Sequence, residues 1–459
     1  MFMETSKNNS EELHPYVIPL PTNTSKRVQY VTTLFFSPIT IKILRLFEWD
    51  KEICQKEIIT LLSQHSNKTV ISSIKKLVSL NLLEEREKIE IRGNRRVRVK
   101  CYKLTDIGKW YNILFKDISE LNSKTAREAI ANLSVMFTAK ILLFLDHLKV
   151  NLTDFINQVM SNALRRVIKS KKYSKYDLVV FGSLALDVYL KPDIKINPGG
   201  SGANIATLAS SLGLKTCFVS RVPADIIGSY LVADLISRGV DVSLVELEQG
   251  VELPVCVILE PLEPVQMKCK IPVDQKSLPV VQEVRDDVIQ ACSNARSLYL
   301  GEGVSKVYLE ILSRINSGNK IVVLRPHILT LEQYFEEFLS ILQYSPILVL
   351  NEEKEQVLKH RGLEIPKDLF KAGAEKVIIT KGSKGAVLYV KNKDPITYSA
   401  PLVNAVNTIG AGDVFSATLI YYLLRDFNIE EAVKKAVYLS ALSTTQLSSR
   451  KYITKLEVN

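Results

Sequence analysis

The stretch Asn407-Thr408-Ile409-Gly410-Ala411-Gly412-Asp413 runs directly into the apolar segment 414–420, VFSATLI. Small residues let the backbone turn tightly and approach a ligand, and the predicted helix that follows points its positive end at the same place. Because like charges repel, an aspartate beside such a site is unsuited to bind phosphate. The natural role of Asp413 is therefore to take a proton from an attacking hydroxyl. The stretch predicts phosphoryl transfer, although the same residues also occur at the plain start of a helix.

Composition limits what class of protein this is. A chain of 459 residues exceeds what one core usually organises, which predicts two or more domains, and the apolar fraction of 46% is that of a globular protein. No apolar run reaches the length of a membrane span, and the N-terminus lacks the basic start and apolar core of a signal peptide. We therefore expect a cytoplasmic protein with no membrane partner.

Charge and cysteine are distributed in informative ways. Residues 1–176 contain 30 Lys and Arg against 17 Asp and Glu, a net charge of +13, whereas the remainder has a net charge of −2. The excess predicts an acidic partner for the first part alone, with double-stranded DNA the obvious candidate. Six scattered cysteines without a CxxC pair, and five scattered histidines, favour reduced buried thiols over a disulfide framework or a zinc site.

From residue 176 the sequence alternates short buried strands with helical segments. The strand candidates are residues 178–181, 217–219, 255–259, 297–300, 321–324, 347–350, 377–380 and 386–390. Such alternation predicts an α/β fold with a doubly wound, mainly parallel sheet, whose ligands bind beyond the carboxyl ends of the strands. Asp187 and Asn204, near predicted strand and helix ends, suit paired hydrogen bonds to neighbouring sugar hydroxyls, and Gly199 and Gly200 let the backbone approach the ring.

These motifs, with Gly228, residues 239–241, residues 380–385 (TKGSKG) and the GAGD stretch, occur in an order that resembles the ribokinase-like, or PfkB-type, carbohydrate kinases. The resemblance covers about residues 176–451. It implies a small β lid around Ile194 and Val255, with ATP and Mg²⁺ as cofactors and a sugar, sugar phosphate or nucleoside as substrate. The implied site residues are Asp413 as base with Gly410, Ala411 and Gly412 holding transferred charge; Asp187, Gly199, Gly200 and Asn204 at the sugar; and Thr380, Gly382, Gly385, Asn351, Ser440 and Ser443 at the nucleotide.

Three positions depart from that family's pattern, and each removes negative charge near the expected metal and nucleotide. Asn407 stands where relatives have an aspartate linked to a monovalent cation, and Lys354 ends the Asn-x-x-Glu motif. Arg325-Pro326-His327 replaces Asp-Pro-Asn. Glu353 or Glu355 could serve for the missing glutamate from one residue away, and Asn407 remains a weak candidate for the cation. A basic side chain could also neutralise phosphate directly.

The first part of the chain predicts a different fold. Helical patterns cover residues 38–47, 55–62 and 68–83, and alternating strands at 89–91 and 97–99 flank the basic tip 92–96. With the closing YKLTDIG at 102–108, residues 33–114 resemble the winged helix-turn-helix domains of archaeal and bacterial transcription regulators. The resemblance implies DNA contacts from the third helix and the wing, by Lys68, Thr69, Ser72, Ser73, Lys75, Lys76, Arg92, Arg95, Arg96 and Arg98. The alternatives are a basic face that only solubilises the domain and a winged helix that contacts protein.

The predicted organisation is a flexible segment 1–30, a winged helix-turn-helix domain 31–115, a helical connector 116–175 and a kinase domain 176–459. The connector is expected to pair two subunits, although its apolar stripes would also pack on the same chain. The basic stretch 169–175 (KSKKYSK) is expected to be a solvated linker, with extra DNA contact as the rival. Two functions remain open: a kinase tethered to a DNA-binding head, or a weak or inactive kinase fold that senses a ligand for a transcription regulator.

Overall fold

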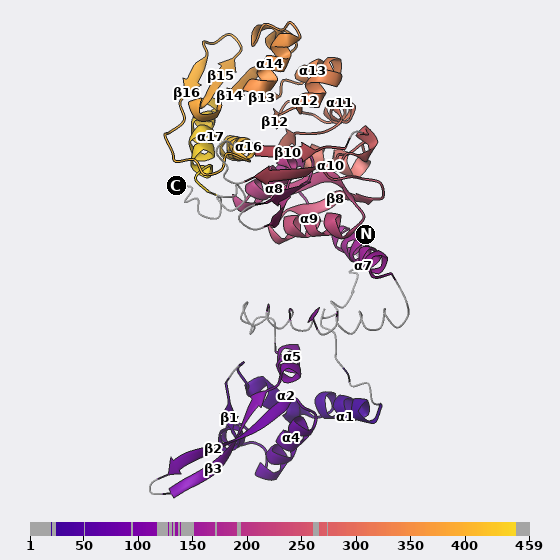
Figure 1. The fold of residues 1–459 in the computed structure, drawn as a ribbon, viewed down its shortest axis with the longest axis vertical. Helices are drawn as coiled ribbons and strands as arrows, with labels where there is room; N and C mark the ends of the chain where they lie inside the picture. Colours follow the sequence, from indigo (N-terminus) through magenta and orange to yellow (C-terminus); the bar gives the residue numbers. More distant parts are fainter. Residues whose placement is uncertain are drawn as a thin grey trace, which may run out of the picture. The chain divides into compact units, whose positions relative to one another are not determined.

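The structure is a computed structural model, and its chain divides into two compact units, Met1–Val150 and Asn151–Asn459 (Figure 1). It describes residues 20, 24–49, 51–92, 95–116, 127, 131, 134, 135, 138, 151–169, 172–190, 194–259, 266–272 and 274–446. Within these ranges, no helix is long and apolar enough to cross a membrane. The two units are described separately below.

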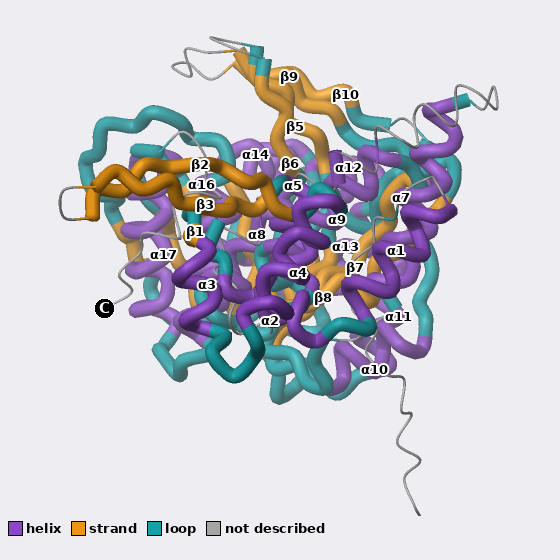
Figure 2. The backbone as a smooth tube through the Cα atoms, turned by 90° about the horizontal axis from the view of Figure 1, so that it is seen from below, coloured by secondary structure: helices purple, strands orange, loops and turns teal. Residues whose placement is uncertain are grey.

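The first unit combines helices with a three-stranded sheet of order β1-β3-β2. Its elements are α1 (Thr24–Phe35), α2 (Pro38–Leu46), β1 (Ile53–Cys54), α3 (Gln55–Leu61), α4 (Asn67–Ser79), β2 (Leu83–Arg92), β3 (Arg95–Leu104) and α5 (Asp106–Leu114). Figure 2 shows β2 and β3 as a long two-stranded ribbon. The expected helices and hairpin are therefore present, while the DNA-binding role of the unit stays a prediction.

Local chemistry explains how α4 forms. The Ser66 hydroxyl accepts a hydrogen bond from the backbone N–H of Thr69 at 3.2 Å, which satisfies one of the free donors at the start of the helix. Val70, Ile74 and Leu77 recur at helical spacing and are fully buried against the core of the unit. Ser73 also lies on this buried face, being only 6% exposed, so its predicted DNA contact is wrong.

Two boundary predictions need correction, one at the start of the first unit and one at the start of the second. Residues 24–30, predicted to be flexible, belong to α1, whose Tyr30 is buried in the core. Most of the connector, residues 117–150, lies outside the described residues apart from five isolated positions. Its last helix, α7 (Leu152–Ile168), packs on α9 (Ile226–Ser237) and β8 (Asp241–Glu248) within the second unit.

The basic stretch at 169–175 is likewise not a free linker where it is described. The backbone N–H of Lys172 donates to Asp241 Oδ2 at 2.7 Å, and the ammonium of Lys172 donates to the Gly239 carbonyl at 2.7 Å. Tyr176 donates its hydroxyl to the same Asp241 oxygen at 3.0 Å. A buried aspartate at the start of β8 therefore fixes this stretch to the second unit.

The second unit is built on a nine-stranded sheet of order β16-β15-β14-β13-β12-β11-β4-β7-β8. Neighbouring strands from β14 to β8 in this order are parallel, and β15 and β16 add antiparallel partners at one edge. Besides β8, the strands are β4 (Leu178–Phe181), β7 (Thr216–Pro223), β11 (Ser297–Leu300), β12 (Ile321–Leu324), β13 (Ile347–Asn351), β14 (Lys376–Thr380), β15 (Ala386–Val390) and β16 (Ile396–Tyr398). The predicted α/β sheet is confirmed, although β8 and β16 were not predicted.

Two helical layers cover this sheet because alternate strand residues point to opposite faces. Leu178 and Val180 enter one core, while Val179 and Phe181 enter the other. The first core is shared with α7, α9, α8 (Ser201–Ser211), α16 (Ala411–Leu423) and α17 (Ile429–Ser443). The second is shared with α10 (Asp286–Asn294), α11 (Ser305–Arg314), α12 (Ile328–Gln333), α13 (Phe335–Leu342), α14 (Glu352–His360) and α15 (Lys367–Lys371).

A separate four-stranded sheet has the order β10-β9-β5-β6. Its strands are β5 (Ala185–Tyr189), β6 (Lys195–Gly199), β9 (Val255–Leu259) and β10 (Gln266–Lys270). Segment 255–259, counted above among the main-sheet candidates, therefore belongs to this smaller sheet, as the lid expectation for Val255 implied. Figure 2 shows these strands projecting from the edge of the unit.

Four of the six cysteines are paired in two disulfides, which corrects the prediction of reduced thiols. Cys54 and Cys101 lie directly opposite on antiparallel β1 and β3, and Cys256 and Cys269 lie opposite on β9 and β10. Opposed residues of antiparallel strands bring their β-carbons within disulfide reach, a relation that sequence spacing does not reveal. Cys217 and Cys292 form no disulfide and are buried, as expected.

Candidate active site

The carboxyl ends of adjacent parallel strands define the site. Arg325 directly follows β12, Asn351 ends β13 and Thr380 ends β14, and these three strands are neighbours in the sheet. Helix α16 contacts both α8 and β12, so the Gly410 turn at its start lies at the same edge. Gly410 has φ of 81°, a left-handed conformation that glycine adopts without strain.

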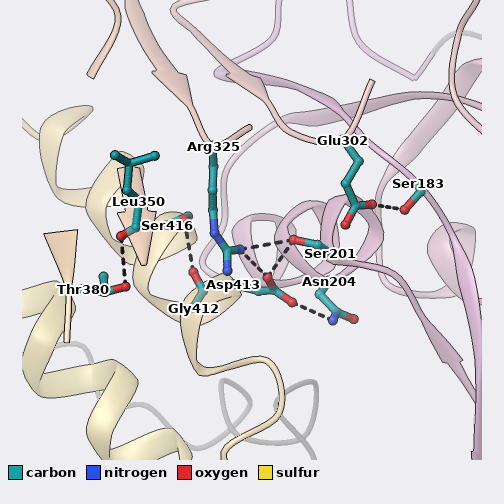
Figure 3. Close-up of polar contacts among 10 residues, drawn as sticks. All are labelled: Ser183, Ser201, Asn204, Glu302, Arg325, Leu350, Thr380, Gly412, Asp413 and Ser416. Carbon is teal, nitrogen blue, oxygen red and sulfur yellow. Dashed lines mark hydrogen bonds and ion pairs between the residues drawn. The ribbon is translucent and has the colours of Figure 1, made fainter. Parts of the chain in front are cut away.

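Asp413 lies in the first turn of α16 and is only 6% exposed. The Ser201 hydroxyl donates to its Oδ1 at 2.7 Å, and the Asn204 amide donates to its Oδ2 at 2.8 Å (Figure 3). Both donors come from the first turn of α8, which starts after Gly200 at φ 94°. Two helix starts therefore meet at one carboxylate.

Arg325 forms an ion pair with Asp413. Its Nη1 lies 2.7 Å from Asp413 Oδ1 and 3.2 Å from the Ser201 hydroxyl oxygen. A β-carbon at Gly412 would lie 2.4 Å from Arg325 Nη2, so the guanidinium rests against the backbone of the glycine turn. Burial on its own lowers the pKa of Arg325, but Tyr299 and Asp413 outweigh it and raise that pKa, which keeps the guanidinium charged.

Lys354 and His327 add to this basic side of the site. Burial, and then the neighbouring Arg325, lower the pKa of Lys354 to about 8, against the partial support of Glu302. Burial also lowers the pKa of His327, despite the nearby Glu302 carboxylate. The His327 Nδ1 accepts from the Leu329 backbone N–H at 3.3 Å, so Nε2 is left to carry the proton of the neutral ring.

A cavity of about 670 Å³ adjoins Asp413. Of the residues predicted for substrate, Asp187, Gly200 and Asn204 line it together with Gly410 and Asp413. Gly199 supports Asp187 from behind, because a β-carbon there would lie 2.4 Å from the Asp187 Oδ1. Most other lining side chains are apolar and include the lid residues Cys256, Met267, Cys269 and Ile271. The cavity suits a small molecule with both hydroxyls and an apolar face.

The residues predicted for the nucleotide do not line this cavity. Asn351 accepts from the Lys354 backbone N–H at 3.0 Å, and Thr380 donates to the Leu350 carbonyl at 3.1 Å. Gly382 has open space where a side chain would stand. Gly385 cannot take a side chain, because its β-carbon would meet the Tyr398 carbonyl. Ser440 and Ser443 donate to carbonyls within α17.

The residues considered for metal binding do not form a metal site. Glu355 is buried and pairs with Lys381 at 2.6 Å and Lys359 at 2.8 Å. Glu353 is exposed, and Asn407 Oδ1 accepts from the Ile409 backbone N–H at 2.9 Å. Among the described residues, no three His, Cys, Asp or Glu side chains come together as a metal centre would require.

Sequence reasoning missed several residues of the site. Ser183 donates to Glu302, and both line the cavity, from the ends of the adjacent strands β4 and β11. Ser201 and Arg325 contact Asp413 directly. The Arg325-Pro326-His327 departure signalled an unusual charge, but nothing in the sequence paired it with a residue 88 positions away.

Taken together, the doubly wound sheet, the glycine turn and the enclosed carboxylate define an α/β protein built to bind a small molecule beside an anion site. Its family is equally clear. The family model for pfkB family carbohydrate kinases matches residues 175–455, so the chain belongs to this family of enzymes.

Related proteins are named as sugar or nucleoside kinases. The chain is 27% identical over 265 residues to a deoxyribokinase of Salmonella typhi, covering 55% of this chain and 83% of that protein. It is 26% identical over 275 residues to a cytidine kinase of Thermococcus kodakarensis, covering 56% and 92%. The solved structure of a Thermotoga maritima ribokinase matches with a TM-score of 0.50 at 24% identity, covers 60% of this chain and 95% of its own, and supports the fold alone.

Proposed function

We propose that the second unit transfers the terminal phosphoryl group of ATP to a hydroxyl of a sugar, sugar phosphate or nucleoside bound in the cavity. The observation that carries this proposal is the position of Asp413, enclosed at the cavity and next to the glycine turn of α16. Asp413 takes the proton of the attacking hydroxyl, and the backbone N–H groups at Gly410, Ala411 and Gly412 stabilise the charge on the moving phosphoryl group.

Substrate binding follows from the cavity. Asp187 and Asn204 provide a carboxylate and an amide for neighbouring hydroxyls, with Gly200 allowing close approach and Gly199 leaving room for the Asp187 carboxylate. The apolar remainder of the cavity suits the uncharged ring of a nucleoside or deoxysugar, in keeping with the named activities of the deoxyribokinase and cytidine kinase relatives. Thr380, Gly382, Gly385, Asn351, Ser440 and Ser443 are proposed to lie along ATP, and any Mg²⁺ would arrive with the phosphates.

The test is transfer of phosphate from ATP, with and without Mg²⁺, to a panel of sugars, sugar phosphates and nucleosides. Wild-type protein should phosphorylate at least one class of acceptor, and Asp413→Ala should lose this transfer. Asp394→Ala is the matched control, because Asp394 is exposed in the loop between β15 and β16. Turnover by Asp413→Ala equal to wild type would remove Asp413 from the proposed role.

For the first unit we infer a DNA-binding function. The order of helices and hairpin fits a winged helix-turn-helix, and the positive excess of the chain lies in residues 1–176. Lys68, Thr69, Ser72, Lys75 and Lys76 are exposed on α4, and Arg96 and Arg98 are exposed on β3. These side chains are available for a duplex, with α4 in the major groove and the hairpin at the backbone. Arg92 and Arg95 remain predicted contacts whose side chains lie outside the described residues.

A regulator that joins the two functions would act as a homodimer, since two heads match a palindromic site. The experiment is an electrophoretic shift titration of duplex DNA fragments from the gene's own upstream region, over a range of salt concentrations, with and without the kinase substrate. Binding should weaken steeply with salt and change with substrate. A flat salt response would favour a winged helix that contacts protein instead.

A further inference from the structure

Two basic side chains converge on the phosphate side of the active site from adjacent strands. Arg325 directly follows β12, and Lys354 lies in the first turn of α14 directly after β13. Because β12 and β13 are parallel neighbours, their carboxyl ends bring the two residues to the same place. Arg325 and Lys354 are therefore close enough to interact electrostatically, and each also interacts with the charge of Asp413.

The guanidinium of Arg325 is fixed by its contacts. Nη1 donates to Asp413 and Ser201, and the side chain is only 21% exposed. Nη2 rests against Gly412, on the turn that would face a transferred phosphoryl group. Arginine offers five N–H donors in a planar fork that matches phosphate geometry, so these contacts leave donors for an anion.

Lys354 is held differently. Its backbone N–H donates a hydrogen bond to Asn351 Oδ1, but its ammonium has no hydrogen-bond or ion-pair partner among the described residues. A largely enclosed lysine that lies beside a second cation and is paired with no carboxylate is costly to keep in a folded protein. A bound anion would provide the counter-charge that the Lys354 ammonium lacks.

The acidic groups nearby are already committed, apart from Glu353, which directly precedes Lys354 and is exposed. Asp413 is paired with Arg325, Glu302 accepts from Ser183, and Glu355 is held by Lys381 and Lys359. Divalent cations require oxygen ligands that are free to approach, and two fixed cations repel such an ion. The charge pattern of this edge therefore fits a phosphate group better than it fits a protein-bound metal.

We propose that Arg325 and Lys354 form a built-in cation pair, which binds a phosphate group of the ligand beside the glycine turn and makes its binding independent of Mg²⁺. This inference rests on the proposed kinase function and specifies how its phosphate-bearing ligand is held. The phosphate belongs either to ATP or to a phosphorylated acceptor. In both cases the planar guanidinium of arginine would donate hydrogen bonds to the phosphate oxygens in the same way.

The test measures binding to the full-length protein by isothermal titration calorimetry, in EDTA and in Mg²⁺. The probes are ATP, ribose 5-phosphate and uncharged ribose. For wild-type protein, Mg²⁺ should change the affinity for the phosphate-bearing probe by less than about threefold. Arg325→Gln and Lys354→Gln should each weaken metal-free binding by about tenfold or more, with ribose unaffected, because each removes a charge-assisted contact.

Matched variants keep the test decisive. Arg314→Gln removes an exposed guanidinium at the last residue of α11, and its affinities should equal those of wild type. Arg325→Lys keeps the charge and should bind more tightly than Arg325→Gln. A double variant, Arg325→Asp with Lys354→Glu, should make binding of ATP depend on Mg²⁺. Circular dichroism checks that each variant is folded.

The outcomes separate this inference from the proposed function. Loss confined to ATP assigns the pair to the nucleotide, and loss confined to ribose 5-phosphate assigns it to the acceptor. Phosphoryl transfer by wild-type protein combined with ATP binding only in Mg²⁺ overturns the cation pair and leaves the kinase intact. Absence of both transfer and nucleotide binding in either buffer overturns the proposed function and this inference together.

Discussion

The two units place their basic side chains in opposite environments. In the first unit, Lys68, Lys75, Arg96 and Arg98 are exposed on a helix and a hairpin. In the second unit, the cations nearest the proposed chemistry are enclosed: Arg325 rests on the glycine turn, and the surroundings of Lys354 lower its pKa to about 8. In the proposed functions, the same residue types therefore bind phosphate in two different physical environments.

The comparison shows two alternative ways to attract an anion: with many exposed cations, or with a few enclosed ones. Exposed cations act together on a polyanion, release its counterions and lose their effect as salt rises. Enclosed cations are few, but solvent and salt screen them weakly, and each one costs stability unless a counter-charge is present. Removing a single charge should accordingly change activity or stability strongly in the second unit. In the first unit it should weaken DNA binding by a small amount for each charge removed.

The largest effect is expected for Asp413→Asn. The loss of the proton acceptor should lower kcat by roughly 10²- to 10⁴-fold. It also leaves Arg325 enclosed without its counter-charge, which should reduce the free energy of unfolding by about 2 kcal/mol or more. Initial rates and urea denaturation measure the two losses. Asp286→Asn, which removes the exposed partner of Arg314, should alter neither.

Lys354→Met should stabilise the protein at neutral pH while weakening ATP binding. The pKa of Lys354 is about 8 in the folded protein and lies below the ordinary value of 10.5, so the unfolded chain binds the extra proton. The cost of the charged lysine is therefore complete below pH 8 and fades as pH rises toward 10.5. Removing it should raise the free energy of unfolding by about 2 kcal/mol at pH 7.

The pH profile identifies this cause. The stability difference between Lys354→Met and wild type, measured by urea denaturation from pH 6 to about 10, should shrink above pH 8. Lys391→Met, at an exposed position, is the control and should show no such trend. A stability gain that is constant with pH would assign the effect to packing rather than to charge.

In the first unit, replacing Arg96 and Arg98 together with alanine should reduce the salt dependence of DNA binding. The slope of log affinity against log salt should fall by about 2, because two phosphate contacts are lost. Fluorescence anisotropy at several salt concentrations measures this slope. Lys42→Ala removes an exposed charge from α2 and should leave the slope unchanged. An equal fall in the slope for Lys42→Ala and for the double arginine variant would indicate general electrostatic attraction without a defined contact by the wing.

The smallest effect separates two neighbouring serines. Ser72 is exposed on α4, and Ser72→Ala should weaken specific DNA binding by less than about tenfold. Ser73 is buried in the core of the unit, and Ser73→Ala should leave DNA affinity unchanged. Anisotropy with a specific duplex compares the two variants. A larger loss for Ser73→Ala would contradict the orientation of α4.

Local signals in the sequence were sufficient for much of the fold. The apolar runs that became β4, β11 and β12 have the predicted bounds, and the glycine turn begins α16 as expected. Asp187, Gly200 and Asn204 line one cavity with Asp413, which lies more than 200 residues further along the chain. Small and polar residues at helix starts succeed as signals because the fold brings the starts of α8 and α16 together, beside β5 of the smaller sheet.

What the sequence did not reveal depends on register and on which face a residue occupies. The disulfides join cysteines that oppose one another across antiparallel strands, and no spacing rule predicts that pairing. Ser73 and Ser72 look alike in sequence, but one residue of helical rotation moves Ser73 into the core. The contact between Arg325 and Asp413 requires the placement of β12 against α16, which only the assembled sheet provides.

The two helix starts that meet at Asp413 also bear on how the protein is made. Ser201 and Asn204 are 212 and 209 residues before Asp413, whereas β11 to β16 are added to the sheet in chain order, each beside the strand before it. A growing polypeptide therefore adds β11 to β16 to the sheet one after another before it reaches Asp413, the proposed proton acceptor. Products that end before residue 409 would carry part of the cavity wall without the glycine turn and without the proposed proton acceptor, so synthesis must pass Asp413 before the site exists.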